Sequence, residues 1–310
     1  MGVLIGMDEA GYGPNLGPLV ITTTVWDTGD HPVDCDLWEI LAEAVTSAPA
    51  DPTRVRLGDS KALYSPATGL AALEMGVQAA LGLMQATGAT WKQLLSTVRA
   101  PELESEPWFS GQDLPLPHAC GSVDIARIEM WKRICDKAGV RLTAIRTDVV
   151  LTSRFNALTM EHNSKGRALS EWSMKLVRSV WPDCPVTPVL VQADKHGGRN
   201  RYQELLPLVI DDEFIQCRGE STASSCYRVG RAEFRFETRS ERYLPVALAS
   251  MVSKYIRELA MELFNRYWAT HVPGIAPTAG YPQDAKRYRT EIAAAQKQLG
   301  ISDDVLWRCR

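Results

Sequence analysis

The first hydrophobic residues of the chain form a short run, residues 3–7, that ends at the acidic pair Asp8–Glu9. Residues 11–18 contain three glycines and two prolines, which excludes regular structure there. Residues 19–26 are rich in Val, Ile and Thr, a composition typical of a strand. The pattern therefore predicts an opening strand, a glycine turn and a second strand.

Apolar residues at helical spacing predict a long helix over residues 246–268, and an alternating pattern predicts a hairpin over 227–237 that turns near Gly230. Residues 99–122 are rich in proline and are expected to form an irregular excursion. The other expected elements are strands over 141–151 and 188–193, and helices over 36–48, 66–86, 124–138, 169–180 and 287–298.

Strands and helices alternate along most of the chain, but the first two strands are joined by a short glycine turn. A parallel pair would need a longer crossover such as a helix, so these two strands are expected to be antiparallel. This order predicts an α/β fold in which helices flank a mixed β-sheet with an antiparallel start. No linker in the sequence demands a second domain, so we expect one domain over residues 1–310.

Composition excludes several protein classes. Apolar residues make up 45% and charged residues 23% of the 310 positions, which argues against disorder. No apolar run is long enough to cross a membrane, and the N-terminal residues do not resemble a signal peptide. The seven cysteines are widely spaced without a C-x-x-C pair, so free thiols in the reducing cytoplasm are expected.

Formal charge is uneven along the chain. The net charge is −3, but residues 195–310 carry +4 and residues 1–194 carry −7. A basic face in the second half is therefore expected, which would suit a nucleic-acid partner.

Two acidic residues stand at the ends of predicted strands. Asp8 precedes the glycine turn, and Asp194 precedes the basic stretch KHGGRNR. Ligand sites of α/β sheets form where strands end in loops, and two carboxylates brought together there repel each other. A hard divalent cation such as Mg²⁺ would relieve that repulsion.

Two further features have both a functional and an ordinary structural interpretation. Glu258 follows Lys254 by one helical turn and borders an apolar stripe, but on composition alone a surface ion pair with that lysine is the more common role. Gly11 and Gly13 would let a ligand approach the backbone closely, or could simply allow a tight turn.

Possible phosphate contacts carry the same ambiguity. Ser60 and Lys61 could hold a phosphate or begin a helix, and Arg199 could contact phosphate or lie in a solvated loop. His196 is the histidine nearest to these residues, and we expect it to be a surface or hydrogen-bonding residue rather than a base.

The string GMDEAGYGPNLGPLVI resembles the opening of the type 2 ribonucleases H, the HII and HIII groups. Further stretches resemble the family in the same order along the chain: RLGDSKAL, residues 154–180, VLVQAD, VALASMVSKYIRE and AGYPQDAKRYRT. The resemblance spans most of the chain and implies a ribonuclease H-like mixed sheet. It also implies insertions near residues 99–122 and 220–243 and a C-terminal helical segment over 271–310.

The resemblance implies a metal-dependent endonuclease that hydrolyses the RNA strand of RNA/DNA hybrids. Two Mg²⁺ or Mn²⁺ ions would be held by Asp8, Glu9, Asp194 and Glu258. The residues implied in contacts with nucleic acid are Gly11, Tyr12, Gly13, Ser60, Lys61, Asn163, Arg199, Lys254 and Tyr281. We expect a monomeric cytoplasmic enzyme with an RNA/DNA duplex as its partner, no membrane association and no organic cofactor.

Some residues depart from the family pattern. Tyr12 stands where the HII group has Arg or Lys, which bears on whether a single embedded ribonucleotide is recognised. Glu258 stands where the family usually has Asp, and the usual histidine before Lys286 is missing. Two alternatives therefore remain: a metal-dependent nuclease of the same fold with another structured nucleic acid as substrate, and a duplex-binding relative without catalysis.

Overall fold

The computed structural model describes residues 2–29, 31–49, 51–65, 67–86, 88–122, 124–184, 186–211 and 213–309. Its strands are β1 (Val3–Ala10), β2 (Leu19–Asp27), β3 (Val45–Thr46), β4 (Val55–Arg56), β5 (Arg141–Val150), β6 (Val189–Asp194), β7 (Ile215–Glu220), β8 (Ser224–Val229) and β9 (Ala232–Glu237). Its α-helices are α1 (Leu37–Ile40), α2 (Ser60–Leu63), α3 (Ala71–Leu83), α4 (Trp91–Thr97), α5 (Ile125–Ala138), α6 (Thr152–Glu161), α7 (Lys165–Arg178), α8 (Leu244–His271), α9 (Pro282–Gln298) and α10 (Asp303–Leu306). Short 3₁₀ helices are η1 (Pro32–Asp34), η2 (Gln203–Leu208) and η3 (Ser240–Arg242).

The main sheet has seven strands in the order β5-β2-β1-β6-β9-β8-β7. Strand β1 pairs antiparallel with β2 and parallel with β6, and β6 pairs parallel with β9. The pairs β2–β5, β8–β9 and β7–β8 are antiparallel. The expected mixed sheet, its antiparallel start and its flanking helices are therefore confirmed.

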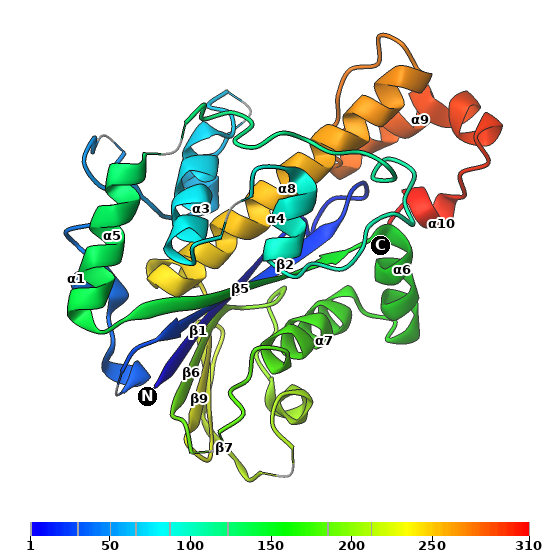
Figure 1. The fold of residues 1–310 in the computed structure, drawn as a ribbon. Coiled ribbons are helices and arrows are strands. Elements are labelled where there is room, and N and C mark those ends of the chain that lie inside the picture. Colours follow the sequence, from blue (N-terminus) through cyan, green and yellow to red (C-terminus); the bar gives the residue numbers. More distant parts are fainter. Residues whose placement is uncertain are drawn as a thin grey trace.

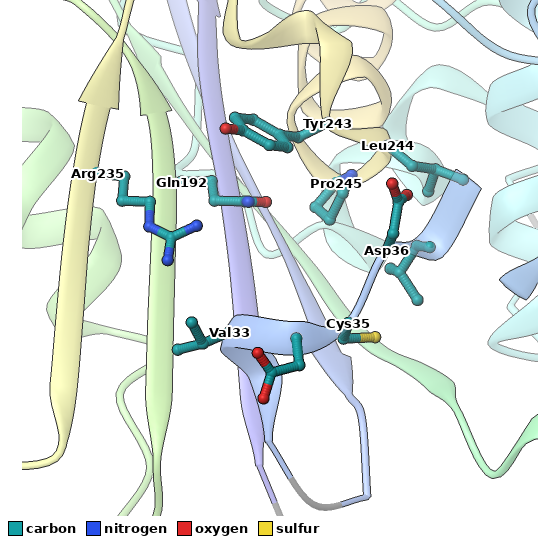
Figure 2. Close-up of a pocket in the computed structure, with 10 residues that line it drawn as sticks. Val33, Cys35, Asp36, Gln192, Arg235, Tyr243, Leu244 and Pro245 are labelled. Carbon is teal, nitrogen blue, oxygen red and sulfur yellow. The ribbon is translucent and has the colours of Figure 1, made fainter. Parts of the chain in front are cut away.

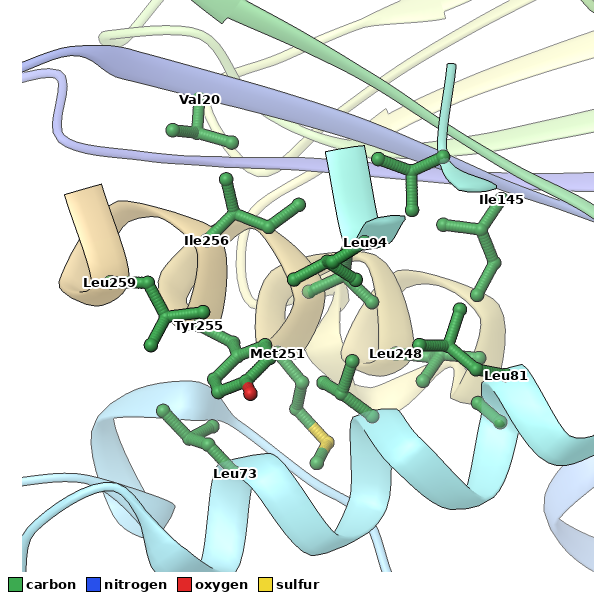
Figure 3. Packing of buried hydrophobic residues seen from close by; sticks show 14 of the residues in the cluster. Val20, Leu73, Leu81, Leu94, Ile145, Leu248, Met251, Tyr255, Ile256 and Leu259 are labelled. Atoms are coloured by element: carbon green, nitrogen blue, oxygen red, sulfur yellow. The ribbon is translucent and has the colours of Figure 1, made fainter. Parts of the chain in front are cut away.

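Helices cover both faces of the sheet (Figure 1). One face packs against α8, with α3 on the outer side of that helix and α4 ending beside β5, and the other face packs against α6, α7 and η2. Strand β1 shows how the two cores divide, since Leu4 belongs to the first and its neighbours Val3 and Ile5 to the second. Figure 3 shows the first core, with Met251 and Tyr255 of α8 facing α3.

Helix α8 lies unusually close to β1 where the helix begins. A Cβ atom at Gly6 would overlap the carbonyl carbon of Pro245 and lie 2.5 Å from its oxygen. The hydroxyl of Thr24 donates to that same oxygen at 2.8 Å, and the hydroxyl of Ser253 is within hydrogen-bond distance of the backbone oxygen of Asp8, at 3.1 Å. These contacts fix the helix over the strand that carries the acidic pair.

Several predicted helices have different bounds in the structure. The helix expected over 36–48 is limited to α1, because the β-branched Val45 and Thr46 pair with β4 as a small parallel sheet. The helix expected over 66–86 is α3, and the proline at 66 that was expected near its start lies outside the described residues.

Two other helices begin earlier than expected. Helix α7 starts at Lys165, where the side chain of Ser164 accepts a hydrogen bond from the N–H of Arg167. Helix α9 starts at Pro282, a residue type that suits the first helical position. The helices α4 and α6 and the strand β7 were not predicted as separate elements, whereas α10 falls within the C-terminal helical segment that the resemblance implied.

The excursion over residues 99–122 has no helix or strand in the structure, as expected. It is nevertheless part of the first core, because it buries Trp108 and Phe109. The buried Glu106 accepts hydrogen bonds from Trp108 and from the N–H of Thr152, each at 2.8 Å. The carboxylate of Glu74 on α3 accepts three backbone N–H groups of residues 118–120, which anchors the other end of the excursion.

The hairpin expected near Gly230 is confirmed as β8 and β9, and β7 extends it to the edge of the sheet. All seven cysteines are free thiols. Within the part of the chain that the structure describes, no helix combines the length and apolar character needed to span a bilayer.

Candidate active site

The two acidic strand ends lie side by side. Strands β1 and β6 run parallel with Met7 opposite Ala193, so Asp8 and Asp194 follow at adjacent strand ends. Both belong to the set of alternate positions that faces α8, with Leu4 and Leu190 earlier in the same strands. The sheet therefore brings two carboxylates together where its parallel strands end, as the sequence predicted.

Hydrogen bonds from neighbouring groups hold both carboxylates in place. Asp194 Oδ1 accepts hydrogen bonds from the N–H and the hydroxyl of Ser240, at 3.3 and 3.1 Å. Asp8 Oδ1 accepts the N–H of Glu9 at 2.8 Å. Asp8 is only 7% exposed.

Burial and like charge act together on the acidic pair. The pKa of Asp8 is raised to about 7, first by burial and then by the charges of Glu241 and Asp194, which together outweigh the lowering effect of a hydrogen bond with Ser250. The pKa of Glu9 is also raised, first by burial and then by Asp8 and Asp194. Asp8, Glu9 and Asp194 thus form one interacting acidic group.

Glu241 is a fourth carboxylate of this group that the sequence analysis missed. It lies in η3, next to the serine that binds Asp194, and its Oε1 is 3.8 Å from Lys61 Nζ. No strand end or motif marks it, since it comes from the segment expected to be an insertion. Only the folding of residues 238–243 against the end of β6 brings it near.

Glu258 has different neighbours. Its Oε1 lies 2.6 Å from Lys254 Nζ and 3.4 Å from Arg257, and its Oε2 accepts the Tyr64 hydroxyl at 2.6 Å. The ion pair with Lys254 considered from the sequence is thus present, but both side chains are largely buried, at 11% and 17% exposed. The Lys254 ammonium also lies over the Tyr64 ring, 4.5 Å from its centre.

The glycine turn after β1 is enclosed by residues from the C-terminal half. Gly11 has φ of +86°, and a Cβ there would lie 2.6 Å from Arg257 Cδ, so both its conformation and its surroundings require glycine. A Cβ at Gly13 would lie 4.0 Å from the ring of Tyr281, which is half exposed. The structure therefore places Gly13 beside Tyr281.

Tyr12 points from the turn toward α7 and the loop after β6. Its hydroxyl lies close to Gly197 and Gly166, and Lys165 Nζ is 4.9 Å from the centre of its ring. Burial raises the pKa of its hydroxyl, and the charge of Glu9 adds to the effect. Tyr12 thus connects the acidic group to the start of α7.

The remaining predicted contacts are spread around this centre. Ser60 is buried, and its hydroxyl is 3.0 Å from that of Ser250. Arg199 donates to Glu204 at 3.2 Å, and Asn163 lies in the turn between α6 and α7 with φ of +48°. Lys61 remains the most exposed of the predicted basic residues named here.

The loop after Asp194 is held by two buried polar residues, one of them the histidine that was expected to lie on the surface or to form hydrogen bonds. Lys195 Nζ donates to the backbone oxygen of Ser221 at 2.6 Å and to Ser225 Oγ at 2.9 Å. His196 is buried, and its N–H donates to the Tyr202 hydroxyl at 2.9 Å. The loop is therefore tied to the β7–β8 hairpin.

A cavity of about 190 Å³ lies on the same face of the sheet, between β6, β9 and the start of α8 (Figure 2). Gln192 and Arg235, which are register partners on these strands, line it together with Tyr243. None of the site residues predicted from the sequence is among its described lining residues.

Carboxylate oxygens are the donors that Mg²⁺ and Mn²⁺ prefer, so the chemistry of the acidic group fits a hard divalent cation. Within the described ranges, no three His, Cys, Asp or Glu side chains converge closely enough to hold an ion. The structure thus contains suitable donors without a preformed metal cage.

No family model matches the chain, and no curated protein matches it. Similar solved structures include ribonuclease H2 from Pyrococcus horikoshii OT3, at 15% identity and a TM-score of 0.46, covering 98% of this chain and 92% of that one. RNase HII of the PCNA complex from Archaeoglobus fulgidus has 14% identity and a TM-score of 0.43, with 99% and 94% coverage. Bst-RNase HIII in complex with Mn²⁺ has 15% identity and a TM-score of 0.42, with 99% and 66% coverage. At these values the likeness carries no weight for function, which must be argued from this chain's own residues.

Proposed function

We propose that this protein is a metal-dependent endonuclease that hydrolyses the RNA strand of RNA/DNA hybrids. The observation that carries the proposal is that Asp8 and Asp194 lie side by side just after the β1–β6 pairing ends, with Glu9 next in β1 and the glycine turn after Ala10. The resemblance of residues 6–21 to the type 2 ribonucleases H agrees with this placement.

Asp8, Glu9, Asp194 and Glu258 would hold the divalent cations. Such ions, when bound, supply the positive charge that phosphodiester hydrolysis requires at the attacking and leaving oxygens. Ser240 keeps Asp194 oriented through two hydrogen bonds, so one ligand is fixed before any ion arrives.

Substrate contacts would come from the residues around the acidic group. Lys61 is exposed beside Glu241 and is free to reach a phosphate. The backbone of Gly11 and Gly13 and the half-exposed Tyr281 would contact the ribose, where only RNA has a 2′-hydroxyl.

The test is cleavage of an end-labelled RNA/DNA hybrid and of a DNA duplex with one embedded ribonucleotide, each with Mg²⁺, Mn²⁺ or EDTA. We expect the hybrid to be cut with either metal and to stay intact in EDTA. The second substrate decides whether Tyr12 permits recognition of a single ribonucleotide. Binding of the hybrid without cutting would instead support the non-catalytic relative. If the protein neither binds nor cuts the hybrid, other nucleic acids become the candidate substrates.

The fourth ligand can be identified by comparing Glu258→Gln with Glu241→Gln. We expect Glu258→Gln to lower the metal-dependent cleavage rate at least tenfold, because a carboxylate ligand loses its charge. Glu241→Gln should change the rate less than threefold, and the Mn²⁺-dependent rise in Tm should follow the same order. A larger loss in Glu241→Gln would assign the fourth ligand to η3.

A further inference from the structure

The end of the chain packs against the glycine turn of the candidate site. Helix α10 and residues 307–309 lie beside α6, at the red end of the ribbon in Figure 1. Asn156 of α6 holds this segment, since its side chain donates to the Trp307 oxygen at 2.9 Å and accepts the N–H of Cys309 at 2.8 Å.

Arg308 shares four hydrogen bonds with residues of the turn, although it lies 297 positions after Gly11 in the sequence. Its Nη2 donates to the carbonyl oxygen of Gly11 at 2.7 Å and to that of Pro14. Its backbone N–H donates to the Asn15 oxygen at 2.9 Å, and the Asn15 side chain donates to the Arg308 oxygen at 3.2 Å.

The guanidinium is placed in surroundings that disfavour a charge. Arg308 is fully buried, and among the described residues its Nε and Nη1 have no hydrogen-bond partner. The ring of Phe155 lies 4.7 Å from its central carbon. Burial, followed by the charge of Arg257, lowers the Arg308 pKa to about 9. The charge of Glu106 acts in the opposite direction. Since a buried charge is costly, the two carbonyl contacts and the Glu106 charge are what compensate for the burial of the guanidinium.

The carbonyl contacts determine where the turn presents its N–H groups. In a trans peptide the C=O and the following N–H point in opposite directions. Because the Gly11 carbonyl points to Arg308, the N–H of Tyr12 points away from that guanidinium. The N–H of Asn15 is already used, because it donates to Gly280 at 2.8 Å.

We propose that Arg308 is a positioning residue that holds the Gly11 and Pro14 carbonyls inward, so that the Tyr12 N–H faces the RNA backbone. This inference rests on the proposed function, because the group that would accept the N–H is a ribose or phosphate oxygen of the hybrid. Arg308 itself touches no substrate and acts only through the turn.

The test compares Arg308→Met, which keeps an unbranched apolar stem but lacks the guanidinium donors, with Asn156→Ala, which removes hydrogen bonds to the same segment but leaves the four bonds between Arg308 and the turn in place. Affinity for a fluorescent RNA/DNA hybrid is measured in an Asp194→Asn background so that the hybrid stays uncut. Amide hydrogen exchange of residues 11–16 is measured on the same proteins without substrate.

We expect Arg308→Met to weaken hybrid binding about tenfold and to speed exchange across the turn, while Asn156→Ala changes affinity less than twofold. The hybrid affinity of Arg308→Lys should lie between those of the two other variants, because lysine can donate to one of the two carbonyls but not to both. Arg308→Lys replaces Arg308→Met in the comparison if the methionine variant does not fold. Equal affinity and equal exchange in the Arg308 and Asn156 variants would overturn the inference. If the background protein binds no hybrid, the proposed function fails, and the exchange measurement alone then decides whether Arg308 orders the turn.

Discussion

Asp194→Asn is expected to lower metal-dependent cleavage of an RNA/DNA hybrid by about a thousandfold or more, which corresponds to about 4 kcal/mol of activation free energy. Asp194 lies beside Asp8 and is already oriented by Ser240, so its negative charge is the part of the site most directly available to a cation. Asparagine keeps an oxygen that can accept both Ser240 hydrogen bonds and removes only the charge. The measurement is the single-turnover cleavage rate with saturating Mg²⁺ or Mn²⁺.

Asp148→Asn is the matched control, because Asp148 is also a strand aspartate with a defined partner, Arg154, at 2.8 Å. That variant should cleave within twofold of the wild-type rate. Both variants should melt within a few degrees of the wild type when no divalent metal is present. An Asp194→Asn protein that cuts at near wild-type rate would remove Asp194 from the metal site and contradict the proposed mechanism.

Gly6→Ala is expected to destabilise the fold by about 3 kcal/mol or more, and the variant could fail to accumulate as folded protein. The added Cβ would overlap the backbone of Pro245, which cannot move aside as a flexible side chain can. Helix α8 would have to shift away from β1, and the hydroxyl contacts of Thr24 and Ser253 would be lost with it. The free energy of unfolding from a denaturant titration measures the effect.

Gly219→Ala provides the comparison for that substitution. Gly219 is also a strand glycine, but nothing lies within 4 Å of the Cβ that alanine would add, so we expect a change below about 1 kcal/mol. A similarly small loss in Gly6→Ala would show that the start of α8 is less closely packed on β1 than the structure indicates.

The strands of the sheet could be predicted because their signals are local. Residues 3–7 and 188–193 are apolar runs that are each followed by an acidic residue. The alternation of charged and apolar residues over 227–237 indicates strands with one solvent-exposed face. The parallel alignment that brings Asp8 beside Asp194 follows from those ends meeting at one edge of the sheet. This part of the candidate site was therefore accessible from the sequence.

Other parts depend on contacts between distant segments and leave no local trace. Residues 36–48 have an apolar pattern compatible with a helix, but Val45 pairs with a strand ten residues later. Glu241 and Arg308 look like ordinary charged residues in the sequence. Their placement near the acidic group and under the glycine turn is decided by the packing of η3 and of the last residues.

The same long-range contacts bear on the order in which the protein becomes functional during synthesis. The glycine turn is synthesised well before its partner Arg308, which lies 297 residues further along the chain. A nascent chain that has folded β1 and β2 still lacks Asp194, α8 and the guanidinium beneath the turn, and domains generally complete folding as units. A chain that stops short of Arg308 would thus hold its acidic pair without a finished binding surface, so any nuclease activity would begin only after translation has passed Arg308.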